Sequence, residues 1–249
     1  LCDKFNLNND KRIYECRKYL ASHFTSEEYW RSVISGWANE DRESDDITEY
    51  WIFFQVAFAQ FPKMMDVLLP LLNILASDQN HMEPQALAAE ITTGLIRGSK
   101  HWSFNDIKKM RSNVLLLLDN SLNNPYFKFW REGMYYSVST LDYARIDWIF
   151  TYFNDKLKSS FHKSTHSLQL THTIEYLVAL FSCLTWRAAK MGTDFFILLM
   201  TEDYLYEAPL LVRMAIGELL QILLSLSFTG IRDSNTNIPI LVPSISKSE

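Results

Sequence analysis

Signals for the start of a helix recur along this 249-residue chain at a constant interval. Pro84, Pro125, His166 and Glu207 lie at or near the start of segments with apolar residues at helical spacing, and they follow one another at 41-residue intervals. A further helix of similar size fits within each interval, over residues 103–122, 142–157 and 185–200. Two helices in each interval indicate a repeat architecture, in which each helix pair packs on the next pair.

We therefore predict an all-α fold, a HEAT/armadillo-like α-solenoid of about five helix pairs, because about 40–47 residues is the period of those two-helix repeats. Residues 1–230 form the repeat segment, with second helices that begin near residues 46, 84, 125, 166 and 207. The alternative is an all-α bundle without repeats. The tail, residues 231–249, contains two Pro and many polar residues, and we predict that it is extended or disordered.

Composition excludes several classes of protein. Hydrophobic residues make up 48% of the chain, and only 7 Gly and 7 Pro are present, which disfavours a β-sandwich or a loop-rich enzyme. The 24 basic and 29 acidic residues form no basic stripe, so we expect no direct contact with nucleic acid. The sequence contains no run of 18 apolar residues, so we predict no membrane span. The 3 cysteines are sparse, which is typical of reduced thiols in the cytosol or nucleus.

Two of the predicted second helices combine large apolar residues with small ones. Ala88 and Ala89 belong to the first of these helices, and Ala215 and Gly217 belong to the second. Small side chains allow neighbouring helices to approach closely, as stacked repeats require. At the end of the first helix we expect Gly98 to form a left-handed cap.

The densest basic cluster follows that helix and comprises Arg97, Lys100, His101, Lys108 and Lys109. One interpretation is a contact site for an anion or an acidic partner, assisted by the N-terminus of the helix that Ser103 caps. The other is local electrostatics, because a basic residue such as Arg97 stabilises the C-terminus of the helix in which it lies.

No motif of an enzyme is present. The sequence lacks GxSxG, GxGxxG and GxxxxGK[ST], and its cysteines and histidines form no recognisable catalytic pattern. His162 and His166 are four residues apart and His172 follows, a spacing that zinc sites use. The surrounding segment is polar and contains neither Cys nor HExxH, so we predict no metal site. We therefore expect a protein that is not an enzyme.

One stretch resembles a known family. Residues 88–102, AAEITTGLIRGSKHW, are similar to a signature of the proteasome activator complex subunit 4 family, in which this helix closes one HEAT-like repeat. Weaker similarity follows the family in the same order through FPKMMDVLLPLL, RIDWIFTYFNDKL and VRMAIGELLQIL. The resemblance covers residues 41–226.

The resemblance implies a HEAT-like solenoid that caps the α-ring of the 20S proteasome and regulates gate opening without ATP. The implied substrates are peptides and acetylated histones, in DNA repair and spermatogenesis. The implied location is the nucleus, and also the cytoplasm. The resemblance implies no cofactor apart from an inositol phosphate, which family members hold at basic openings.

The sequence departs from the family in length and in its last residues. It ends in Ser-Lys-Ser-Glu, where the family has a Tyr-bearing docking segment, and it lacks the bromodomain-like region through which histone contact is implied. We therefore expect a fragment or short homologue that does not activate a proteasome alone. The alternative is a HEAT-repeat scaffold of the nuclear-transport or phosphatase-adaptor kind, which would not carry the GLIRGSKHW run.

Overall fold

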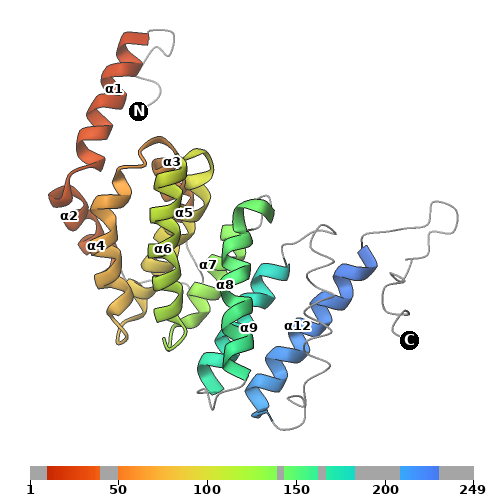
Figure 1. Ribbon diagram of the computed structural model, residues 1–249. Coiled ribbons are helices and arrows are strands. Elements are labelled where there is room, and N and C mark those ends of the chain that lie inside the picture. The colour runs from red at the N-terminus through yellow and green to blue at the C-terminus, as the bar shows by residue number, and fades with distance from the viewer. Residues whose placement is uncertain (1–9, 40–49, 139–142, 162–166, 183–207, 230–249) are drawn as a thin grey trace, which may run out of the picture. The chain divides into compact units, whose positions relative to one another are not determined.

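The computed structural model describes residues 10–39, 50–138, 143–161, 167–182 and 208–229 (Figure 1). The tail predicted to be extended or disordered, residues 231–249, lies outside the described residues. In the described ranges, no helix has the length and apolar character needed to cross a membrane. The helices are α1 (Asp10–Phe24), α2 (Glu27–Trp37), α3 (Tyr50–Gln60), α4 (Met64–Ser77), α5 (Met82–Gly98), α6 (Phe104–Ser121), α7 (Phe127–Val138), α8 (Tyr143–Phe161), α9 (Ser167–Ser182) and α12 (Leu210–Thr229).

The helices at the predicted second positions of the repeats are α3, α5, α7, α9 and α12. They begin at residues 50, 82, 127, 167 and 210, where the sequence predicted 46, 84, 125, 166 and 207. The interval from α3 to α5 is the shortest, because its two helices, α3 and α4, have 11 and 14 residues, whereas α5 and α6 have 17 and 18.

The chain divides into two compact units, and unit 1 comprises Leu1–Asn120. In unit 1, α3 lies along α5, α4 packs against α5, and α2 packs against α4. Helix α5 is the centre of the unit, because every side chain from Gln85 to Ile96 is buried. The amide of Gln85 donates hydrogen bonds to the carbonyl oxygens of Leu75, Ala76 and Asp78, and so satisfies the C-terminus of α4.

Unit 2 comprises Ser121–Glu249 and is organised around α9. This helix contacts α7, α8 and α12, and its apolar residues form the core with aromatic residues such as Phe150 and Phe153. Tyr176 of α9 is fully buried, and its hydroxyl lies 2.5 Å from Oγ of Ser121. The hydrogen bond satisfies a polar group that would otherwise destabilise the core.

Contacts between stacked helices repeat at nearly the same sequence separation. Hydrogen bonds join Arg17 to Gln60, Arg97 to Gln55, Trp102 to Phe58 and Lys109 to Asp66, at separations of 43, 42, 44 and 43 residues. Equivalent positions of successive repeats therefore face one another. In both units, second helices pack on second helices, and the regular elements of the described ranges are all helical. The predicted all-α, HEAT-like fold class is confirmed.

Candidate functional site

The corner between α5 and α6 begins with two glycines at which α5 approaches α3 closely. Gly94 and Gly98 are four residues apart and therefore lie on one face of α5. A Cβ atom at Gly94 would lie 2.9 Å from the backbone nitrogen of Gln55, and still closer to Cβ of Phe54. A Cβ atom at Gly98 would lie 2.7 Å from the carbonyl oxygen of Gln55. Both glycines thus permit a close approach of two helix backbones.

The expectation of a left-handed cap at Gly98 is wrong. Its φ is −69°, in the right-handed helical region, and the chain continues into a 3₁₀ turn over Ser99–His101. Glycine occupies this position because a side chain would collide with α3. The requirement is spatial, and positive φ plays no part.

Trp102 closes the corner. Its indole Nε1 donates a hydrogen bond of 2.9 Å to the carbonyl oxygen of Phe58, near the C-terminus of α3. In a continuing helix that carbonyl would accept from the residue four positions later, but Pro62 has no N–H group. The buried indole therefore satisfies an acceptor that the backbone leaves without a donor.

Arg97 of the predicted basic cluster also contacts α3. Its Nε donates a 2.6 Å hydrogen bond to Oε1 of Gln55, and its guanidinium carbon lies 4.9 Å from the centre of the Trp51 ring. Burial lowers the pKa of Arg97 below its usual range. The side chain is therefore engaged in helix packing within unit 1.

The other four residues of the basic cluster lie on the surface. Ser103 caps α6 as predicted, because its Oγ accepts a 3.3 Å hydrogen bond from the backbone N–H of Asp106. Lys109, one turn further along α6, forms an ion pair with Asp66 of α4. Lys100, His101 and Lys108 are exposed. The cluster thus separates into Arg97, which packs against α3, and four exposed residues, of which Lys109 forms an ion pair with Asp66 of α4.

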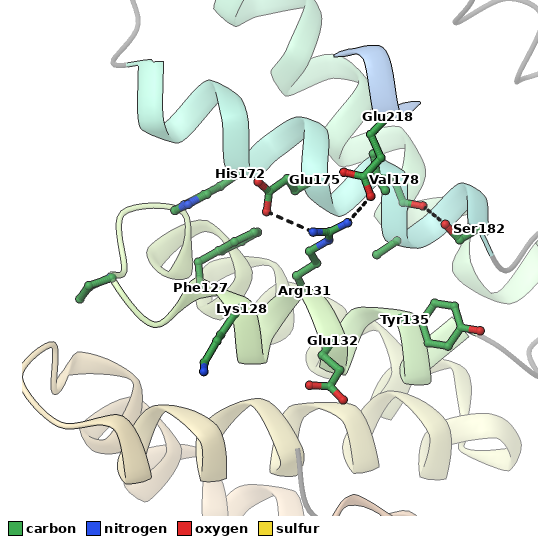
Figure 2. A pocket seen from close by; sticks show the side chains of 12 residues that line it. Phe127, Lys128, Arg131, Glu132, Tyr135, His172, Glu175, Val178, Ser182 and Glu218 are labelled. Atoms are coloured by element: carbon green, nitrogen blue, oxygen red, sulfur yellow. Dashed lines mark hydrogen bonds and ion pairs between the residues drawn. The ribbon is translucent and has the colours of Figure 1, made fainter. Parts of the chain in front are cut away.

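A second candidate site is a cavity of about 530 Å³ in unit 2 (Figure 2). Sequence reasoning missed it. Side chains of α7, α9 and α12 line it, with Arg131 of α7 between Glu175 of α9 and Glu218 of α12. Nη2 of Arg131 lies 2.5 Å from Glu218, and Nη1 lies 4.0 Å from Glu175. The repeat period is the signal that could have found these residues, because they occur once in each of three successive second helices.

The electrostatics of the cavity depend on Glu175 and His172. Burial raises the pKa of the Glu175 carboxyl, opposed by the positive charge of Arg131 and reinforced by the negative charge of Glu218. Burial also lowers the pKa of His172, although a hydrogen bond to the carbonyl oxygen of Leu122 acts in the opposite direction. The imidazole stacks on Phe127 at 3.9 Å between ring centres and 6° between planes. His172 is therefore mainly neutral at pH 7.

The histidine arrangement considered for zinc is only partly visible. His162 and His166 lie outside the described residues, and His172 contacts Leu122 and Phe127 as stated above. Within the described ranges, no three His, Cys, Asp or Glu residues are grouped in a way that could hold a metal ion.

The helices are paired, second helices stack on second helices, and contacts recur at one repeat period. These features define a HEAT-type repeat protein. A family model described as "Proteasome activator complex subunit 4-like, HEAT repeat-like" matches residues 4–175. The chain belongs to this family.

Several proteins named proteasome activator complex subunit 4 are similar in sequence to this chain. The chain is 29% identical over 146 residues to proteasome activator complex subunit 4 of Xenopus laevis, and 30% identical over 142 residues to that of Homo sapiens. It is 28% identical over 146 residues to subunit 4A of Danio rerio. These alignments cover 55–56% of this chain and 8% of each relative. The chain thus spans less than a tenth of the length of these relatives.

Proposed function

We propose that this chain is a stacked-helix segment of an ATP-independent activator that caps the 20S proteasome and regulates the opening of its gate. The observation that carries the proposal is the family match over residues 4–175. The helix stacking within each unit supports it, because stacked helix pairs are an architecture that many proteins use to bind other proteins. In this role the chain binds another protein, and it performs no chemistry of its own.

The partner that we propose is the α-ring of the 20S core particle, contacted in the context of a longer protein. The substrates are peptides and acetylated histones, degraded in DNA repair and spermatogenesis, and the location is the nucleus and also the cytoplasm. These details rest on the resemblance of the 88–102 stretch to the family. The scaffold alternative, of the nuclear-transport or phosphatase-adaptor kind, shares the repeat architecture but lacks support from the family match.

The test is binding to purified 20S particles. The longest protein encoded by the reading frame that contains this chain is purified and mixed with 20S particles, and binding is followed by native electrophoresis and by hydrolysis of a fluorogenic peptide without ATP. We expect a stable complex and faster hydrolysis. A folded protein that does not bind 20S particles would overturn the proposal. Binding to a transport receptor or a phosphatase in its place would favour the scaffold alternative.

The proposal extends to the exposed basic residues Lys100, His101 and Lys108 as contacts for an anion such as an inositol phosphate. Their exposure supports this role, and the N-terminus of α6 beside them adds positive potential. Titration of the chain with inositol hexakisphosphate tests it by calorimetry. We expect the double variant Lys100→Glu, Lys108→Glu to bind about tenfold or more weakly. Unchanged affinity would exclude these residues as the anion site.

A further inference from the structure

No further inference is drawn: the strongest candidate, the exposed apolar face of α12 in unit 2 that carries Leu210, Met214 and Leu224, supports none because nothing in the described residues shows what covers it.

Discussion

The indole Nε1 of Trp102 donates a hydrogen bond to the carbonyl oxygen of Phe58, which lies 44 residues earlier in the chain. The separation is close to one repeat, so the bond joins equivalent regions of successive helix pairs. It also compensates for Pro62, which has no N–H group to offer that carbonyl. Residues 88–102, the stretch that resembles the family, therefore contribute to the packing of α5 against α3.

Substitution of Trp102 tests this bond. Trp102→Phe keeps an aromatic ring but removes the donor, so the carbonyl of Phe58 remains buried without a partner. We expect the free energy of unfolding to fall by about 1–3 kcal/mol, measured by urea denaturation. Phe104→Leu, at a nearby residue that is 79% exposed, should change it by less than about 0.5 kcal/mol. Equal effects of the two variants would contradict the role of the hydrogen bond.

Two glycine substitutions have opposite expected signs. Gly94→Ala places a Cβ 2.9 Å from the Gln55 nitrogen, so the helices must separate, and we expect a loss of about 1–3 kcal/mol. Gly217→Ala, in α12, adds a Cβ with no atom within 4 Å, and should raise stability by about 0.5–1 kcal/mol because alanine favours a helix. Thermal and urea unfolding of both variants measure this difference. A stable Gly94→Ala variant would show that α3 and α5 need no close approach.

Arg97→Lys separates helix packing from helix-end electrostatics. Lysine keeps the positive charge at the C-terminus of α5 but lacks the planar group that stacks on Trp51 and the Nε–H that bonds to Gln55. We expect a loss of about 1–2 kcal/mol. The matched exchange Lys100→Arg, at an exposed residue, should have little effect. If Arg97→Lys is neutral by denaturation, the charge alone explains the residue.

Glu175 gives a dependence of stability on pH with a defined sign. Burial raises the pKa of this carboxyl in the folded protein above its ordinary value of 4.5, so the folded state holds the proton more tightly than the unfolded state. The contribution of Glu175 is fully present below pH 4.5 and is lost as pH rises through the folded pKa. The Glu175→Gln variant should therefore gain stability relative to the wild type as pH rises through this interval.

Urea denaturation of both proteins at a series of pH values measures that difference, with Glu27→Gln as a control for an exposed carboxylate. A difference that is constant with pH, or that falls as pH rises, would show that Glu175 is well paired by Arg131 in the folded protein.

The helical class and the repeat could be predicted from the sequence, because apolar spacing and helix-start residues are local properties that recur from one helix pair to the next. The sequence also predicted the cap at Ser103, which depends on residues only three positions apart. The basic cluster was recognised as a group in sequence, but sequence proximity did not show that Arg97 faces Trp51 and that Lys109 faces Asp66.

Which residues meet across repeats depends on how the helices pack, and the sequence did not show it. Gly98 was interpreted as a left-handed cap because the C-terminal end of a helix commonly uses glycine in that way, whereas contact with Gln55 and Phe58 is what excludes a side chain there. Arg131, Glu175 and Glu218 are separated by one repeat each and form a cavity only when α7, α9 and α12 pack together. The physical reason is that helix register and rotation fix these contacts, and both depend on the packing of the whole unit.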